Sequence, residues 1–313
     1  MIGIPDPRSA LRLLRRQPQA SPRPLPLRDP APEPGLFGPG SVTWVVMREP
    51  RLLLAAGRAL LMQAANPLVA QGAIEHSTYK SDPYGRLERT VRWVTIVCFG
   101  TTREAERVSG RVSALHRPVS GNLPEVNATS RVGAGTPYSA SDPALLRWVH
   151  ASFVDTMLVA HDALVGGLSA AQRDAFVREW DAVARLMGLS RTQCWPDNAS
   201  LQRYVEQEVR RGQALPGAGS REVAETVLHP PVRSRLMRLG METLAFIASG
   251  LLPSELRRGY GIIWTPAHAA AFAALTRSLR LATTALPRRL RISPVYDLAL
   301  ARSEGRWPDA RAA

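Results

Sequence analysis

The stretch of residues 82–121, DPYGRLERTVRWVTIVCFGTTREAERVSGRVSALHRPVSG, decides the fold of this chain. It predicts two helices, residues 86–98 and 102–117, which are separated at Gly100 and ended by Pro118. The first four residues of the stretch, DPYG, are expected to form a turn that leads into the first helix. The remaining elements are expected to pack around this helix pair.

Polar side chains on this pair could form a site. Arg86 and Thr90 are four residues apart, so they share one face of the first helix, and His116 ends the second. In an apolar pocket these groups could hold the anionic edge of a cofactor or a metal ion. They could equally be ordinary core polarity, with His116 favoured at that position by the helix dipole. Arg86 and Arg89 lie near a helix start, where the dipole disfavours cations, so an acidic partner or ligand is expected for them.

Helical patterns continue on both sides of the pair, and strand signals are almost absent. The further expected helices are residues 49–65, 68–77, 143–165, a helix opened by the Ser169/Gln172 capping box, 199–211, 221–228, 231–248, 253–260 and 266–285. The sequence therefore predicts an all-α protein with a single multi-helix domain over residues 41–290. Residues 1–40, rich in Pro and Arg, are expected to be a disordered tail, and residues 291–313 a basic C-terminal tail.

The formal net charge is +14, and it comes almost entirely from arginine because Lys80 is the single lysine. The arginines are scattered and accompany no zinc-finger spacing or aromatic RNA-binding signature, so no nucleic-acid partner is expected. A compositional bias towards Arg and Ala explains this charge, although it would also favour peripheral contact with an anionic membrane surface. The oligomeric state is not defined by these features.

Cysteine usage and hydropathy bear on the compartment. Cys98 and Cys194 lie far apart without a CxxC partner, as is typical of buried thiols in a reducing compartment. The N-terminus lacks the apolar core of a secretory signal, and apolar runs such as residues 244–252 are too short to span a bilayer. We expect a cytoplasmic protein without a transmembrane segment.

The standard catalytic motifs are missing from the sequence. None of the six histidines forms an HExxH or Glu-x-x-His pair, and no nucleophile elbow or Walker loop occurs. His150 and His161 are eleven residues apart and share a helix face. They could line a pocket, or they could be core imidazoles that are each bonded to a backbone carbonyl or a water.

Several strings together resemble one known family. They are GLFGPGSVTW, REPRLLLAAGRALLMQAANPLVAQGAIEHS, DPYGRLERT, ALHRPVSG, YSASDPALLRWVHASFVDTML, GLSAAQRDAFVREWDAVARLMGL and GLLPSELRRGYGIIW, spread over residues 35–290. In order and spacing they are similar to the catalytic-domain family of oxygenase MpaB and the rubber oxygenases (latex clearing protein), also called DUF2236. The resemblance implies a globin-like helical core that binds haem b and uses O2.

The resemblance also implies site residues. It places the Arg-x-x-Lys-Thr element of rubber oxygenases on Arg86, Arg89 and Thr90, the proximal haem ligand on His116, and a further pocket position near His150. Arg89 departs from the family lysine: it stays protonated and cannot donate a lone pair to iron, although it could bond a haem propionate. The acid that rubber oxygenases keep near the distal pocket has no clear equivalent, and Glu75 is a weak candidate, so polyisoprene is not implied as the substrate.

These implications lead to one function and its alternatives. The expected function is a haem b-dependent oxygenase that oxidises or cleaves a C=C bond of an apolar alkene or prenyl-type small molecule, with Arg86 and Thr90 as catalytic groups. The alternative is a non-catalytic helical protein that binds haem or a lipid-like ligand. A nucleic-acid-binding protein is a third reading and rests on charge alone.

Overall fold

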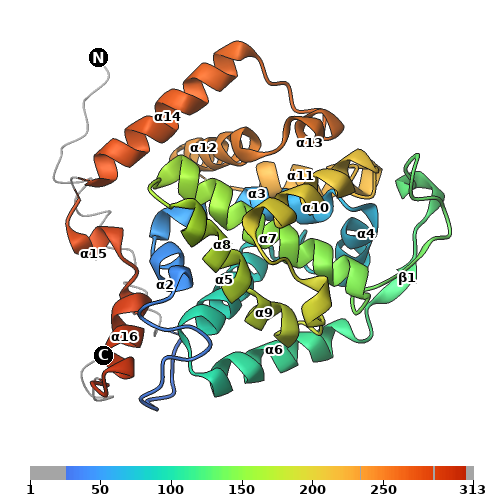
Figure 1. Ribbon diagram of the computed structural model, residues 1–313. Helices are drawn as coiled ribbons and strands as arrows, with labels where there is room; N and C mark the ends of the chain where they lie inside the picture. The colour runs from blue at the N-terminus through green and yellow to red at the C-terminus, as the bar shows by residue number, and fades with distance from the viewer. Residues whose placement is uncertain (1–25, 233, 285, 308–313) are drawn as a thin grey trace, which may run out of the picture.

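The computed structural model describes residues 26–232, 234–284 and 286–307, and within them it is all-α apart from one short hairpin (Figure 1). The helices are α2 (Val42–Met47), α3 (Ala56–Ala64), α4 (Pro67–His76), α5 (Pro83–Phe99), α6 (Thr102–His116), α7 (Pro143–Leu164), α8 (Ala170–Glu179), α9 (Asp181–Leu186), α10 (Asn198–Arg210), α11 (Ala218–Leu228), α12 (Arg235–Leu251), α13 (Ser254–Gly259), α14 (Pro266–Thr284), α15 (Arg288–Arg291) and α16 (Pro294–Ser303). Short 3₁₀ helices are η1 (Pro50–Ala55), η2 (Glu125–Asn127) and η3 (Arg191–Gln193). The predicted fold class, an all-α single domain, is confirmed.

The predicted helix pair is α5 and α6, and their caps explain where they begin. The Asp82 carboxylate accepts a hydrogen bond from the N–H of Gly85 at 2.9 Å, and Pro83 occupies the first helical turn. The four residues expected to be a turn are thus the cap and first turn of α5. Thr101 and Glu104 form a reciprocal capping box that starts α6.

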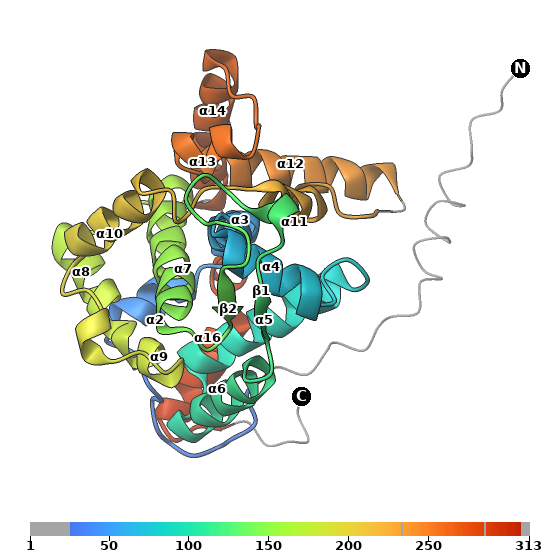
Figure 2. The same ribbon diagram turned by 90° about the vertical axis from the view of Figure 1, so that its right-hand side faces the viewer.

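The long helix α7 lies at the centre of the molecule, between α3, α10 and α14 (Figures 1 and 2). A buried ion pair fastens it there: the Arg58 guanidinium of α3 lies 2.6 Å from the Asp155 carboxylate of α7. Arg58 also donates to Thr156 (2.5 Å), and Gln202 of α10 donates to Asp155 (2.7 Å). Because both charges are paired and hydrogen-bonded, the pair fixes three helices in one arrangement.

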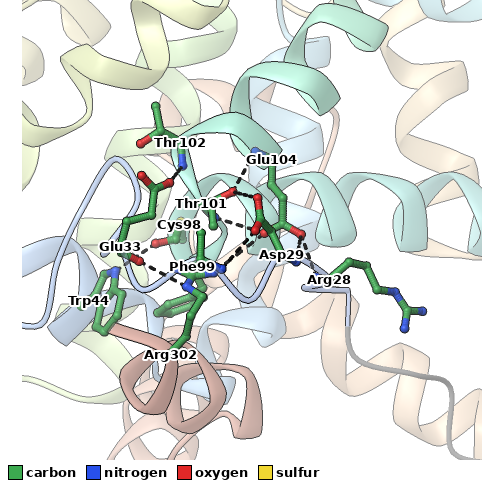
Figure 3. Close-up of polar contacts among 11 residues, drawn as sticks. Arg28, Asp29, Glu33, Trp44, Cys98, Phe99, Thr101, Thr102, Glu104 and Arg302 are labelled. Carbon is green, nitrogen blue, oxygen red and sulfur yellow. Dashed lines mark hydrogen bonds and ion pairs between the residues drawn. The ribbon is translucent and has the colours of Figure 1, made fainter. Parts of the chain in front are cut away.

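The residues before α2 pack against the start of α6 (Figure 3). The Glu104 carboxylate accepts hydrogen bonds from the backbone N–H groups of Arg28 (2.7 Å) and Asp29 (3.0 Å). This segment also buries two apolar side chains, those of Leu27 and Phe37. Residues 26–40 therefore belong to the packed domain and differ from the disordered tail expected for them. The rest of that predicted tail, residues 1–25, lies outside the described residues.

Helix α16 closes the other side of the same α5–α6 turn (Figure 3). The buried Arg302 guanidinium donates to the carbonyls of Phe99 (2.8 Å) and Glu33 (3.2 Å) and lies 3.8 Å from the Glu104 carboxylate. We call this turn, with Glu104 and Arg302, the clamped end of the helix pair. The C-terminal tail expected over residues 291–313 differs from the structure, because it contains α16, which is helical and packed. Residues 308–313 lie outside the described residues.

The loop expected after α6 contains a two-stranded antiparallel hairpin, β1 (Ser120–Asn122) and β2 (Pro137–Ser139). Its register pairs Ser120 with Ser139. Three residues per strand give too little apolar periodicity for the sequence to reveal it.

No single helix among the described residues is both long and apolar enough to cross a membrane. Only η1 and α3 taken together with α4 pass that test of length and composition, and the two segments are bent by 106° at their junction.

Candidate functional site

An apolar cavity lies between α3, α5, α11 and α12, with further walls from η1 and α4. Its volume is about 150 Å³, and it is open to solvent at its mouth. Ligand and cofactor pockets typically enclose about 300–1,000 Å³. Gly57 of α3 lets α12 approach closely, since a Cβ at this position would lie 3.0 Å from the Cβ of Ala248. The cavity is therefore smaller than a typical cofactor pocket: its enclosed part can hold a small apolar group, and a larger ligand would extend into the open mouth.

Arg86 supplies the positive charge of this cavity. Its side chain lines the wall and is half-buried, and no described carboxylate forms an ion pair with it. Burial, and then the nearby charge of Arg89, lower the pKa of Arg86. A cation in this setting is stabilised by an anionic group that enters the cavity.

Thr90 lines the same cavity one helical turn further along α5. Its hydroxyl donates to the backbone carbonyl of Arg86 at 3.1 Å. Because a hydroxyl has one proton to donate, in this rotamer Thr90 offers a ligand only acceptor lone pairs.

Arg89 faces away from the cavity-lining set. Its exposed guanidinium lies 3.1 Å from the Asp82 carboxylate and donates to the Thr78 hydroxyl at 3.2 Å. The acidic partner expected for an arginine at this helix start is therefore found for Arg89, and it is the helix-capping residue. The predicted contact of Arg89 with a haem propionate stays a prediction.

His116 lies at the exposed C-terminal end of α6, as predicted, and outside the set of residues that line the cavity. Desolvation by the surrounding protein, and then the positive charge of Arg86, lower the pKa of His116. The imidazole is thus favoured in its neutral form, the form that can donate a lone pair to a metal. Arg86 links the cavity to His116: it lines the cavity, and its charge also lowers the pKa of His116.

His150 and His161 lie elsewhere, on α7 among buried side chains. The His150 ring stacks on Trp195 (centroids 6.0 Å apart, interplanar angle 8°), and burial lowers its pKa to about 4. Burial also lowers the pKa of His161 to about 4, and its Nδ1 has no hydrogen-bond partner among the described residues. Neither ring lines the cavity.

Glu75 is part of a hydrogen-bond network with the hairpin. It accepts bonds from the Tyr138 hydroxyl and from Gln71 (2.6 Å), and the Tyr138 bond is the main reason that its pKa is lowered. It does not line the cavity, so its carboxylate has structural partners where it stands.

Sequence reasoning missed the walls that α11 and α12 contribute. Tyr79 and Tyr84 were also missed; both line the cavity, and each is held by a distant partner. Tyr79 donates to Glu222 at 2.9 Å, and Tyr84 donates to the carbonyl of Pro231 at 3.2 Å across the cavity mouth. The apolar stripe of α12 was a usable signal for a wall, but nothing in the sequence says which helix it faces.

The described residues contain no cluster of three or more His, Cys, Asp or Glu side chains able to hold a metal ion. A haem iron needs only one or two axial ligands from the protein, so a single imidazole is sufficient for that kind of site.

Comparison with known proteins gives one match. The family model described as "ER-bound oxygenase mpaB/B'/Rubber oxygenase, catalytic domain" matches residues 43–281, which span the cavity and every predicted site residue. No significant similarity was found to a curated protein or to a solved structure.

Proposed function

Because the chain belongs to this family of oxygenase catalytic domains, we propose that it is a haem b-dependent oxygenase that acts on an apolar alkene or prenyl-type small molecule. Membership itself supports an oxygenase role that uses O2 and a small-molecule substrate. The observation that carries the finer proposal is Arg86, a half-buried cation without a described carboxylate partner in a mostly apolar cavity.

The side chains at and beside the cavity are of the kinds that hold a haem, and the cavity would have to widen to admit the porphyrin. The apolar walls suit the porphyrin ring, and Arg86 suits a propionate, since arginine bonds carboxylates in a planar, charge-assisted geometry. A neutral His116 within reach of the Arg86 charge suits the iron. When bound, the haem would supply the O2 chemistry.

The chain's own groups would then have separate tasks. The Arg86 guanidinium would hold the cofactor edge and offset negative charge in the cavity. The Thr90 hydroxyl would accept a hydrogen bond as it stands, or donate one after rotating off the Arg86 carbonyl. The walls from α3, α11 and α12 would exclude water and hold the alkene. No part of this assignment requires His150.

Haem titration of the purified full chain tests the proposal. We expect stoichiometric binding with a Soret band, loss of the histidine-ligated spectrum in His116→Ala, and no change in His268→Ala, which removes an exposed imidazole on α14. Absence of a Soret change at saturating haem would refute haem dependence. If His116→Ala bound haem as tightly as the unaltered chain, the ligand assignment would be wrong.

The same cavity could serve a protein that binds haem or a lipid-like ligand without turnover. Oxygen uptake separates the two functions: an oxygenase consumes O2 when an apolar alkene and a reductant are supplied, and a carrier does not. A haem-loaded chain that takes up no O2 with any of a series of prenyl alcohols would favour the carrier.

A further inference from the structure

The first turns of α12 expose large apolar side chains. Leu236 is 81% exposed, Leu239 is 61% exposed and Met237 is 53% exposed. Folded chains rarely expose adjacent large apolar residues unless they meet a partner or a membrane. We call Leu236, Met237 and Leu239 the apolar tip.

Two exposed arginines, Arg235 and Arg238, are interleaved with the apolar tip. Neither forms an ion pair with a carboxylate of the described residues. On the helix, Arg235 lies one turn before Leu239 on the same face, and Arg238 lies beside that face, so the arginines border the apolar side chains. A helix end that exposes large apolar side chains bordered by arginines suits the interface of an anionic membrane, where the apolar groups enter the lipid and the arginines meet the headgroups.

The apolar tip is continuous with the cavity mouth. Met237 precedes Met241 by one helical turn, and Met241 lines the cavity. On the opposite rim, Leu53 and Leu87 both line the cavity and are exposed to solvent. Figure 2 shows the start of α12 and the start of α5 projecting on the same side of the molecule, and the Tyr84 hydroxyl bridges them by its bond to Pro231.

We propose that the apolar tip, with Arg235 and Arg238, docks the protein on an anionic lipid bilayer and turns the cavity mouth towards the lipid. The docking stands on exposure, charge and position alone. Its use, to deliver an apolar substrate from the bilayer into the cavity, rests on the proposed function. A second copy of this chain is a poorer occupant, because the arginines of the two copies would repel one another and the chain carries +14.

Vesicle co-sedimentation of the full chain tests the docking. With vesicles of equal parts phosphatidylcholine and phosphatidylglycerol, the double variant Leu236→Glu/Leu239→Glu should bind about 100-fold more weakly than the unaltered chain. Val126→Glu is the matched control, since Val126 is also exposed (73%) but lies on η2, away from the tip. All three chains should give the same circular dichroism spectrum, because the changed positions are exposed.

Charge is tested separately. Arg235→Gln/Arg238→Gln should weaken binding to the anionic vesicles by about tenfold, and high salt should weaken binding of the unaltered chain. Arg203→Gln/Arg210→Gln on α10 is the control, and it should have a smaller effect. Equal binding of the tip variant and the unaltered chain, or no binding of the latter at low salt, would overturn the proposal. A dimer that the tip variant abolishes, without vesicle binding, would assign this face to a second copy.

The outcome can be separated from that of the proposed function. Haem titration of the tip variant should match that of the unaltered chain, because the tip does not hold the cofactor. Vesicle binding without haem binding would leave the docking surface and remove the oxygenase. Haem binding without vesicle binding would remove the docking surface and leave the proposed oxygenase.

Discussion

The two ends of the α5–α6 helix pair differ in how their polar groups are used. At the clamped end, Glu104 accepts three backbone N–H bonds and Arg302 donates to two carbonyls, and the two buried charges lie 3.8 Å apart as an ion pair. At the other end, which we call the open end, Arg86 lines a cavity without a described carboxylate partner and His116 is exposed. The same two helices are thus fixed at one end and carry polar side chains available to a ligand at the other, as is expected where a rigid scaffold positions a site.

The largest effect is expected at the clamped end. Glu104→Ala removes the acceptor of three backbone N–H groups and the ion-pair partner of the buried Arg302, so the free energy of unfolding should fall by about 3–5 kcal/mol. Denaturant unfolding measures this. Glu106→Ala, at an exposed position of the same helix, is the control and should change stability by less than about 0.5 kcal/mol. A small effect of Glu104→Ala would show that the clamp does not hold the pair together.

Folding stability at acid pH should depend on the buried imidazole of His150 more than on an exposed imidazole such as that of His116. The pKa of His150 is about 4 in the folded chain and about 6.5 when unfolded. The unfolded state therefore binds the extra proton as pH falls from 6.5 to 4, and stability should decrease by about 3 kcal/mol over that range because of this group. The loss should be absent at neutral pH.

Unfolding of His150→Phe at pH 7 and pH 5 measures the contribution. This variant keeps an aromatic ring against Trp195, and its stability should depend less on pH than that of the unaltered chain. His268→Phe changes an exposed ring and should keep the full pH dependence. Equal dependence in all three chains would mean that His150 takes up its proton without unfolding.

A moderate effect, on binding and not on folding, is expected at the open end. Arg86→Leu removes a partly desolvated charge that has no described carboxylate partner, so stability should hold or rise, while haem affinity should fall by about 10- to 100-fold. Arg92→Leu on the same helix changes an exposed arginine outside the cavity and should leave affinity unchanged. Loss of stability with unchanged affinity would reverse the roles assigned to the two ends.

The smallest effect should come from Arg89. Its ion pair with Asp82 is solvent-exposed, so Arg89→Ala should leave the free energy of unfolding unchanged within measurement. Haem titration decides its predicted propionate contact: unchanged affinity would assign Arg89 to helix capping alone. Arg103→Ala, at an exposed position of α6, is the comparison.

Much of the helix pattern was readable because its signals are local. The predicted Ser169/Gln172 box acts on an N–H group three residues away and is present in the structure. The caps at Asp82 and at Thr101 with Glu104 are equally local, although they were not predicted. The grouping of Arg86 with Thr90 was equally local, since one helical turn brings them to one wall. The packing of residues 26–40 and of α16 was not foreseen, because their composition resembles that of a tail while their partners lie far along the chain.

The sequence by itself determined the helices, their starts and the basic, lysine-poor character of the chain. Tertiary structure alone decided which polar groups are paired. The buried pairs Arg58–Asp155 and Arg302–Glu104 join residues far apart in sequence, and the cavity takes walls from α3, α5, α11 and α12. Periodicity shows that a helix has an apolar face, but which surface covers that face is set by packing of the whole chain, because burial is a property of the assembled fold.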